Sequence, residues 1–331
     1  MAKVIYYNID DNLDYENRLL REWGVTDIEL IEMKDPDRKT EFTEAVQAAD
    51  GVVVEYDQVT AARMKQLPHL KIVALQSIGY NNVDIPAATA HGVCVTNIPG
   101  FCTEEVATHT VGMLLDLARQ ITFLDRTVRA GKWNPLLGYT MRRLSGKTFG
   151  MVFFGSIPKA MLPVLKALGM HVLVYAPTKT RDYLAEFGVE KAETLEELCE
   201  RSDVVSMHCP LSDATRGMMG AAQFAKMKPS AFFINTARGG VVDEAALVHA
   251  LQTGEILAAA VDVIEDEATE QSALFALENT VITPHAAFLS EDSFYNGRKM
   301  ALEQLVQRLS LRQIPSNLVN KEVHIAFEED F

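Results

Sequence analysis

Short apolar runs alternate with amphipathic segments along this chain of 331 residues, and this alternation restricts its fold more than any other feature. A first series of apolar runs indicates strands at residues 3–7, 28–31, 51–54 and 71–75. A second series indicates strands at residues 151–154, 171–175, 204–207, 231–235, 257–263 and 281–283. Strands separated by helical patterns are typical of parallel sheets with helices on both faces. Two such series predict an α/β protein with two doubly wound parallel-sheet domains.

A long helical pattern at residues 103–131 separates the two series. Thr103 is expected to cap this helix, and Glu104 and Glu105 in its first turn suit the positive end of the helix dipole. Apolar residues cover more of the helix than one buried face needs, which places it centrally or in a dimer interface. We therefore expect a homodimer. A last helical pattern at residues 291–308 is expected to pack back on the N-terminal domain.

Composition argues against several classes of protein. The 31 Lys and Arg residues against 45 Asp and Glu give a formal charge of -14, which disfavours non-specific binding to nucleic acid or anionic lipid. No apolar stretch approaches the roughly 18 residues of a membrane span, and the N-terminus lacks a signal-peptide pattern. The cysteines show neither a CxxC pair nor metal-ligand spacing with histidine: they are Cys94, Cys102, Cys199 and Cys209. We expect a cytoplasmic protein that binds no metal, nucleic acid or membrane.

The segment 150–158, GMVFFGSIP, lies between a predicted strand and a predicted helix, where a dinucleotide-binding fold has its G-x-G-x-x-G turn. Gly155 keeps the middle glycine, where a side chain would block the approach of a pyrophosphate. Phe153 and Pro158 replace the first and third glycines. An ordinary strand–turn–helix therefore explains the segment equally well.

The helix after this turn has two further features. The N–H groups of Ser156 and Ile157 at its start offer an anion site. Pro163 cannot donate a hydrogen bond to the carbonyl near Lys159, which predicts a kinked or late-starting helix.

Five sequence blocks are more specific than the glycine turn. They are residues 97–110 (NIPGFCTEEVATHT), 208–211 (HCPL), 227–244 (MKPSAFFINTARGGVVDE), 261–263 (VDV) and 283–285 (TPH). In this order and spacing they resemble the D-isomer-specific 2-hydroxyacid dehydrogenases, from about residue 52 to residue 320. The sequence TPHAAF at 283–288 and the turn at 97–100 are similar to the branch that contains the C-terminal-binding proteins and their bacterial relatives.

The resemblance implies an oxidoreductase that transfers a hydride between a nicotinamide cofactor and a 2-oxo acid/2-hydroxy acid pair, with D specificity. It also implies a flavodoxin-like substrate-binding domain and a Rossmann cofactor domain. We expect the first domain to comprise residues 1–98 plus 289–331, and the second to comprise residues 99–288.

Three catalytic residues are implied: Arg238, Glu267 and His285. The chemistry requires these residue types, since a guanidinium can hold a carboxylate and polarise a carbonyl, and a histidine can deliver a proton near neutral pH. A carboxylate beside the imidazole stabilises its protonated form. Taken singly, a structural salt bridge, a solvated acidic run at 265–267 and an ordinary histidine explain them as well. Glu265 is the alternative to Glu267.

The cofactor site is expected at Gly155, Ser156, Ile157, Ala176, Thr178, His208, Cys209, Pro210, Thr215, Thr236, Ala237, Arg238, Asp262 and His285. Cys209 is alternatively a reactive thiol, but nothing nearby in the sequence favours its ionised form, and a packing role is preferred. Other histidines have no partner motif and indicate surface or packing positions: His69, His91, His171, His249 and His324.

The turn at residues 77–84 follows a strand of the first domain. The resemblance implies that the N–H groups of Ile78 and Gly79, with the adjacent Tyr80, bind the substrate carboxylate opposite Arg238, although an ordinary turn explains Gly79 equally well. Aromatic residues available to line the pocket favour an aliphatic or aromatic 2-oxo acid over glyoxylate: Tyr56, Tyr80 and Phe288.

The cofactor preference depends on the end of the second strand of the cofactor domain. NAD-specific folds place an acidic residue there to bind the ribose, and Ala176 occupies that position. Thr178, Lys179 and Arg181 follow closely and favour NADP(H) over NAD(H). Alternatively, the two basic side chains simply face solvent.

Two other functions compete with the oxidation or reduction of a hydroxy acid. The altered glycine turn favours a cofactor-sensing, non-enzymatic dimeric binding module, whereas Arg238, Glu267 and His285 argue against it. A formate dehydrogenase is disfavoured because such enzymes carry glutamine where Glu267 stands.

Overall fold

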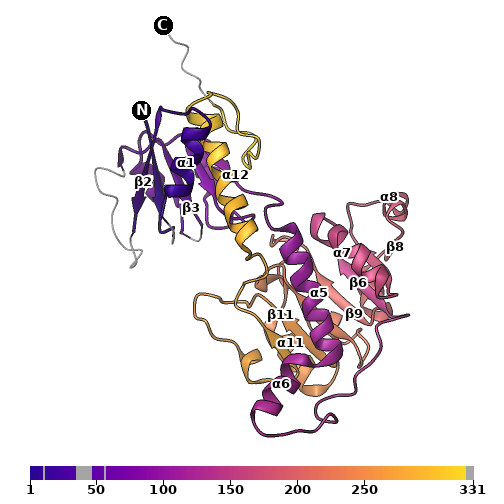
Figure 1. Ribbon diagram of the computed structural model, residues 1–331. Helices are drawn as coiled ribbons and strands as arrows, with labels where there is room; N and C mark the ends of the chain where they lie inside the picture. The colour runs from indigo at the N-terminus through magenta and orange to yellow at the C-terminus, as the bar shows by residue number, and fades with distance from the viewer. Residues whose placement is uncertain (10–11, 35–46, 56, 326–331) are drawn as a thin grey trace. The chain divides into compact units, whose positions relative to one another are not determined.

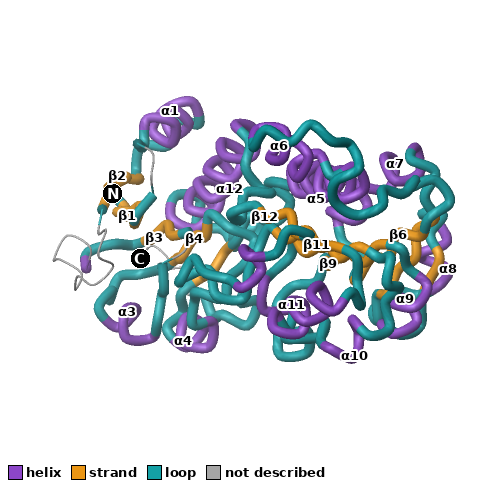
Figure 2. The backbone as a smooth tube through the Cα atoms, turned by 90° about the horizontal axis from the view of Figure 1, so that it is seen from below, coloured by secondary structure: helices purple, strands orange, loops and turns teal. Residues whose placement is uncertain are grey.

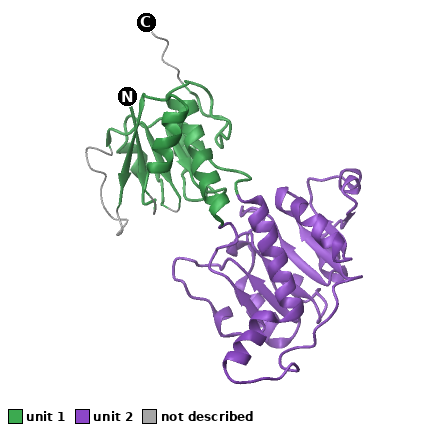
Figure 3. Cartoon of the chain, viewed as in Figure 1, with its two compact units in different colours: residues 1–101, 290–331 green, residues 102–289 purple. Residues whose placement is uncertain are grey.

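The computed structural model describes residues 1–9, 12–34, 47–55 and 57–325. The chain divides into two compact units (Figure 3). Unit 1 comprises Met1–Phe101 with Ser290–Phe331, and unit 2 comprises Cys102–Leu289. The junctions expected from the sequence lie after residues 98 and 288, within three residues of these.

Unit 1 is built on a parallel sheet of five strands in the order β2-β1-β3-β4-β5. The strands are β1 (Ala2–Tyr7), β2 (Ile28–Met33), β3 (Gly51–Val54), β4 (Ile72–Leu75) and β5 (Cys94–Thr96). This strand order is that of flavodoxin-like folds. The expected fold of the first domain is therefore confirmed.

Helices cover both faces of this sheet (Figures 1 and 2). One face packs against α1 (Asp14–Glu22) and α12 (Glu291–Leu309), and the other packs against α3 (Ala61–Lys65) and α4 (Ile85–Ala90). Burial on both faces explains why the strands are continuously apolar instead of alternating. The C-terminal helix α12 thus lies on the sheet of the N-terminal strands.

Unit 2 contains a parallel sheet of seven strands in the order β12-β11-β10-β9-β6-β7-β8. The strands are β6 (Thr148–Val152), β7 (His171–Tyr175), β8 (Glu190–Lys191), β9 (Val204–Met207), β10 (Phe232–Asn235), β11 (Ala258–Val261) and β12 (Thr280–Ile282). The chain runs outward from β6 to β8 and then crosses back to β9 on the other side of β6. This crossover is the arrangement of a Rossmann fold.

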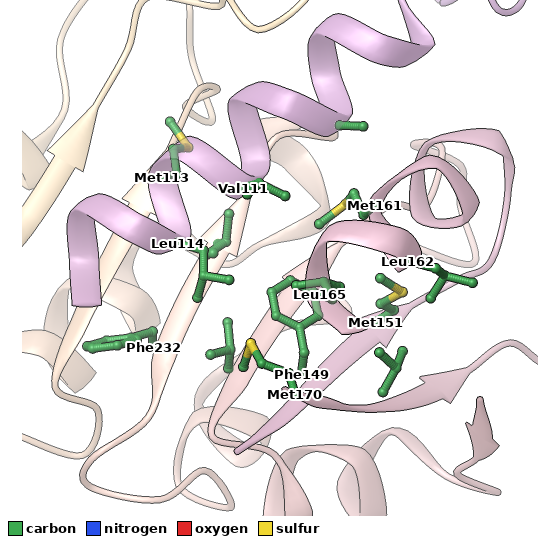
Figure 4. Close-up of a cluster of buried hydrophobic side chains, with 14 of the residues drawn as sticks. Val111, Met113, Leu114, Phe149, Met151, Met161, Leu162, Leu165, Met170 and Phe232 are labelled. Atoms are coloured by element: carbon green, nitrogen blue, oxygen red, sulfur yellow. The ribbon is translucent and has the colours of Figure 1, made fainter. Parts of the chain in front are cut away.

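Helices again lie on both faces of the sheet of unit 2 (Figure 2). The helices are α5 (Thr103–Arg119), α6 (Ile121–Arg129), α7 (Ser156–Ala167), α8 (Arg181–Glu186), α9 (Leu195–Arg201), α10 (Ala221–Phe224) and α11 (Glu244–Thr253), with short 3-10 turns at Gly239–Val241 and Ala273–Ala276. Figure 4 shows α5 and α7 over the sheet, with Leu114, Phe149 and Leu165 fully buried between them. The apolar residues of α5 are mostly buried within the chain: Val106, Ala107, Val111, Met113, Leu114, Leu117 and Ala118. Helix α5 is therefore central to unit 2, which is one of the two positions expected for it.

The predicted helix at 103–131 is wrong in two respects. Cys102 occupies the N-cap position and Thr103 is the first helical residue, so Thr103 is not the cap. The helix also breaks at Gln120, which adopts a left-handed conformation with φ of 53°. The Gln120 side chain donates to the carbonyl of Tyr139 at 2.6 Å and accepts from its N–H at 3.1 Å. These long-range bonds compensate the unfavourable backbone conformation.

The start of α7 also differs from the prediction. The helix begins at Ser156 without delay, although Pro158 and Pro163 lie within it. Pro158 falls in the first turn, where N–H groups have no helical acceptor, and its missing donor therefore costs nothing there. Pro163 is exposed, so the Lys159 carbonyl that it leaves without a donor faces the solvent side. The strand predicted at 151–154 is shifted, since β6 ends at Val152.

Candidate active site

The predicted cofactor residues of unit 2 follow the carboxyl ends of its parallel strands. Strands β6 and β9 are neighbours from which the chain proceeds in opposite directions, and open α/β sheets bind ligands beside such a switch point. Gly155 follows β6, and His208, Cys209 and Pro210 follow β9. The topology therefore brings these two predicted segments to the same edge of the sheet.

The turn between β6 and α7 leaves the N-terminus of α7 open. Phe153 has a φ of 75°, in the left-handed region that glycine enters at little cost. Its N–H donates to the Tyr175 carbonyl at 2.7 Å. No atom lies within 4 Å of the point that a Cβ of Gly155 would occupy, and Ser156 and Ile157 form the first turn of α7. The turn thus presents an open helix N-terminus that fits a phosphate group.

The end of β7 carries no acidic side chain at the ribose position. Ala176 is buried, and Thr178 is exposed. The Nζ atom of Lys179 lies 5.1 Å from the ring centre of Tyr183, whose hydroxyl accepts a 2.8 Å hydrogen bond from Lys159. The guanidinium of Arg181, in contrast, is paired with Glu193 at 2.5 Å. Lys179 is therefore the basic side chain of this segment that no carboxylate neutralises among the described residues.

The segment after β9 is held by side-chain packing and hydrogen bonds. Burial lowers the pKa of His208 to about 3, so its ring is neutral. Burial raises the pKa of the Cys209 thiol to about 11, and its Sγ lies 3.6 Å from the sulfur of Met218. This environment supports packing over thiolate chemistry at Cys209. The Thr215 hydroxyl donates to the Pro210 carbonyl at 2.6 Å and thereby fixes the turn.

Arg238 lies in a turn shaped by Asn235 at the end of β10. The buried Asn235 side chain accepts from the Ala237 N–H at 3.0 Å and donates to the Arg238 carbonyl at 3.0 Å. One guanidinium nitrogen of Arg238 donates to the Ala237 carbonyl at 2.6 Å. Within the described ranges no carboxylate forms an ion pair with Arg238. The neighbouring Thr236 is buried and bonded to Thr110 at 2.8 Å. The charge of Arg238 is therefore available to an anionic ligand.

His285 and Glu267 form a direct pair. The Nδ1 atom of His285 lies 2.9 Å from Oε2 of Glu267, and the two side chains are 31% and 44% exposed. With Nδ1 facing the carboxylate, Nε2 is the nitrogen that can pass a proton to a ligand. The carboxylate beside the imidazole is therefore that of Glu267. Glu265, the alternative from the sequence, donates its backbone N–H to the Glu244 carboxylate.

Asp262 supports the turn that carries His285. Its buried carboxylate accepts from the Thr283 hydroxyl at 2.5 Å and from the N–H groups of Ala286 and Ala287 at 2.9 Å each. The Asp262 carbonyl also accepts from the His285 N–H at 2.7 Å. The Asp262 carboxylate therefore accepts hydrogen bonds from three groups of the protein. The cofactor contact expected for Asp262 from the sequence stays a prediction.

His109 is a member of this site that the sequence analysis did not single out. Its Nε2 lies 3.0 Å from the Thr283 hydroxyl and 3.8 Å from Asp262 Oδ1. The signal was present, because His109 falls inside the block 97–110 that carries the family resemblance. Its partner Thr283 lies 174 positions away in the sequence, and only the fold brings the two together.

The turn predicted to bind substrate lies in unit 1, after β4. The Ser77 hydroxyl donates to the Gly79 carbonyl at 2.7 Å, and the Asn97 side chain donates to the Ile78 carbonyl at 2.7 Å. In the part of the chain that the structure describes, the N–H groups of Ile78 and Gly79 have no acceptor. Tyr80 is 45% exposed. Backbone N–H groups without an acceptor in a turn held by side-chain bonds can receive an anionic ligand. Tyr56, also predicted near the substrate, lies outside the described residues.

Across the described ranges, no helix is long and apolar enough to cross a membrane. The same ranges contain no group of three His, Cys, Asp or Glu side chains placed to hold a metal ion. All four cysteines are buried and unpaired by disulfides.

Comparison with known proteins gives consistent matches. The family model for the D-isomer specific 2-hydroxyacid dehydrogenase, NAD binding domain, matches residues 111–287. A glyoxylate reductase from Korarchaeum cryptofilum is 38% identical over 305 residues, which cover 90% of each chain. A D-3-phosphoglycerate dehydrogenase from Methanocaldococcus jannaschii is 34% identical over 283 residues, which cover 85% of this chain and 54% of the relative.

A solved structure agrees with these sequence matches. The NADPH-dependent glyoxylate/hydroxypyruvate reductase from Sinorhizobium meliloti, in complex with NADP and malonate, has a TM-score of 0.84 and 27% identity, over 98% of this chain and 99% of that chain. The matches do not favour a non-enzymatic binding module, and the narrower C-terminal-binding-protein-like branch stays a prediction. The chain belongs to the D-isomer-specific 2-hydroxyacid dehydrogenases, and it is a nicotinamide-dependent oxidoreductase of 2-hydroxy acids.

Proposed function

We propose that this enzyme reduces a small 2-oxo acid, glyoxylate or hydroxypyruvate, with NADP(H), and that Arg238, Glu267 and His285 are its catalytic residues. The observation that carries the proposal is the 2.9 Å pair of His285 and Glu267, which follows β12 and β11 at the same sheet edge as the uncompensated Arg238 after β10. A cation and a proton donor are the two groups that this reduction requires from the protein.

Each catalytic side chain has a distinct role in the proposal. Arg238 holds the substrate carboxylate and polarises the carbonyl group. His285 delivers a proton from Nε2 to the carbonyl oxygen, while Glu267 fixes the orientation of the ring and lies beside its charge when the ring carries two protons. A bound nicotinamide supplies the hydride that reduces the carbonyl carbon. The N–H groups of Ile78 and Gly79, with Tyr80, form the second carboxylate-binding element, so unit 1 is the substrate-binding domain and unit 2 the cofactor domain.

The cofactor fits the carboxyl edge of the sheet in unit 2. The open N-terminus of α7 at Gly155, Ser156 and Ile157 suits the pyrophosphate, and the nicotinamide half lies toward Thr236, Ala237 and Asp262 in this proposal. The remaining cofactor contacts are Ala176, Thr178, His208, Cys209, Pro210 and Thr215. Their positions at successive strand ends support one continuous cofactor site.

The preference for NADP(H) is supported by charge. Ala176 removes the carboxylate that would repel a 2′-phosphate, and Lys179 offers an uncompensated ammonium three residues later. Arg181 supports the preference less, because Glu193 already neutralises it. The structurally similar reductase from Sinorhizobium meliloti is NADPH-dependent, which agrees with this assignment.

The proposed substrate reverses the preference for a larger 2-oxo acid that the aromatic residues suggested. Tyr80 is nearly half exposed within unit 1 and does not enclose a pocket there. The relatives described above are named for glyoxylate, hydroxypyruvate and 3-phosphoglycerate, which are all small and polar. We therefore place glyoxylate and hydroxypyruvate ahead of aliphatic and aromatic 2-oxo acids.

We further propose a homodimer, with its interface at α6 and the segment that follows it. Large apolar side chains are exposed there: Ile121 (60%), Val128 (44%), Trp133 (87%) and Leu136 (88%). Such a gathering is typical of a surface that another chain covers. Light scattering of the wild type and of the double variant Trp133→Asp/Leu136→Asp tests the interface.

We also propose a cytoplasmic location. The four cysteines are not paired in disulfides, which is compatible with a reducing compartment.

A coupled screen tests the enzymatic proposal. NADPH and NADH oxidation is followed with glyoxylate, hydroxypyruvate, pyruvate and phenylpyruvate in parallel. We expect the highest kcat/KM for glyoxylate or hydroxypyruvate with NADPH. Faster turnover of phenylpyruvate, or a clear preference for NADH, would overturn the corresponding half of the proposal.

A further inference from the structure

Two adjacent carboxylates at the start of α11 bind different parts of unit 2. Asp243 is the N-cap residue, and its side chain accepts from the Ala246 N–H at 3.0 Å. Glu244, the first helical residue, points its carboxylate to another part of unit 2. Its Oε2 accepts from the Glu265 N–H at 3.0 Å, and its Oε1 accepts from the Ser272 hydroxyl at 2.6 Å. Because Asp243 already caps the helix, Glu244 is not needed for that purpose.

The two bonds of Glu244 clamp the ends of the loop that carries Glu267. Glu265 begins the loop and Ser272 closes it, and Ser272 also caps the following 3-10 turn by accepting from the Leu274 N–H at 3.1 Å. Apart from the bond of Glu267 to His285, the described bonds inside the loop are local, such as Ala268 N–H to Asp266 at 3.2 Å. No strand or helix spans these residues. Besides the Glu267–His285 pair, Glu244 therefore supplies the long-range hydrogen bonds that tie the described part of this loop to the domain.

The reach of Glu244 is set by a close backbone approach beside it. A Cβ on Gly239 would lie 1.7 Å from the Ile264 carbonyl oxygen, so the turn after Arg238 touches the start of the loop. Only glycine permits this approach. The contact brings the beginning of α11 next to the loop and lets Glu244 reach both of its ends.

We infer that Glu244 is a positioning residue for the pair of Glu267 and His285. This inference rests on the proposed function of that pair. The His285 turn is already fixed by the buried Asp262, whereas Glu267 is 44% exposed on an irregular loop. An exposed ion pair forms weakly when its side chains must first be ordered. Glu244 removes that cost, since it holds the loop in the conformation in which Glu267 meets Nδ1 of His285.

Glu244→Ala and Ser272→Ala test the inference, with Asp243→Ala as the matched control. For 2-oxo acid reduction we expect Glu244→Ala to move the alkaline limb of the kcat/KM profile to lower pH, with a loss of roughly tenfold at alkaline pH, below the effect of removing a general acid. Glu267→Gln should move the limb in the same direction, and the double variant should show no further movement. Asp243→Ala should lower the melting temperature and leave the pH profile unchanged.

A second measurement does not depend on turnover. The downfield proton resonance of the hydrogen-bonded His285 Nδ1–H, assigned by its loss in His285→Gln, should disappear in Glu244→Ala and persist in Asp243→Ala. If Glu244→Ala fails to fold, Ser272→Ala and Glu244→Gln, each of which breaks one of the two bonds, decide the question.

The possible failures are distinguishable. A wild-type protein that reduces no 2-oxo acid overturns the proposed function, and the resonance still tests the clamp. An active wild type with an unchanged profile and resonance in Glu244→Ala and Ser272→Ala overturns the inference and leaves the proposed function standing.

Discussion

The hydroxyl of Thr283 donates to the buried carboxylate of Asp262 at 2.5 Å. A threonine hydroxyl has one proton, so its oxygen must accept from any further partner. The Nε2 atom of His109, 3.0 Å from that oxygen, is therefore the donor, which fixes a proton on Nε2. The hydrogen bonds therefore run in one direction, from His109 on α5 to Thr283 after β12 and on to Asp262 after β11, which holds the turn of His285.

Asp262→Asn should destabilise the protein and lower turnover. One amide oxygen cannot satisfy the Thr283 hydroxyl and both N–H groups of Ala286 and Ala287, and an unsatisfied buried group costs about 1–3 kcal/mol. Urea unfolding measures this cost, and NADPH oxidation measures the loss of kcat. Asp266→Asn, on the exposed loop nearby, serves as control. Wild-type kcat in folded Asp262→Asn would contradict the proposed support of His285.

His285→Ala and Arg238→Ala should each abolish most 2-oxo acid reduction without unfolding the protein. Loss of a general acid costs roughly 10²- to 10⁴-fold in rate, and loss of substrate orientation costs a comparable factor. Glu267→Gln should cost less and mainly change the pH profile. Steady-state kinetics with thermal melting separates catalysis from folding. Near-normal turnover in His285→Ala would remove the proposed proton donor.

The sequence predicts those parts of the site that depend on local pattern. Apolar runs located most strands, and the residues after them, such as Arg238 and His285, were assigned by their place at strand ends and by the family resemblance. Strand β8 was missed because it spans only Glu190–Lys191, too few residues for a periodic signal. Strand β5 (Cys94–Thr96) was also missed, although β12 (Thr280–Ile282) is equally short and was located.

Interactions between distant residues were not predictable in the same way. The clamp by Glu244 joins residues 28 positions apart, and the contact of His109 with Thr283 joins residues 174 apart. The break at Gln120 escaped detection because a glutamine in a left-handed conformation has no sequence signature. Tyr139, which binds its side chain, becomes a neighbour only after folding.

At position 153 a glycine variant should be more stable than an alanine variant, the reverse of the usual order of stability. Its φ of 75° costs any residue with a Cβ roughly 1–2 kcal/mol, and glycine avoids this cost. Phe153→Ala keeps the strained backbone and loses the ring packing, so it should be less stable than Phe153→Gly by about 1 kcal/mol. Urea unfolding of both variants makes the comparison. We also expect Phe153→Gly to bind NADPH more tightly, by fluorescence titration. A more stable alanine variant would show that the turn relaxes.

Acid sensitivity should depend on His208. Burial lowers its pKa from the ordinary 6.5 to about 3, so the folded state excludes a proton that the unfolded chain accepts. The folded protein therefore loses stability on acidification. The contribution of His208 is complete above pH 6.5, the pKa in the unfolded chain, and is lost as pH falls from 6.5 toward 3. At 1.4 kcal/mol per pH unit, about 2 kcal/mol should be lost by pH 5.

The variant His208→Leu isolates this contribution, because leucine fills a partly buried site and does not titrate. The unfolding free energy in urea is measured at pH 7.5 and at pH 5 for the wild type and the variant. We expect the decrease between the two pH values to be smaller in His208→Leu. His171→Gln is the matched control, since His171 is exposed at the start of β7 and should leave the wild-type decrease intact. If His208→Leu loses as much stability as the wild type, the acid sensitivity arises from the carboxylates, and His208 is not the buried neutral ring that its surroundings indicate.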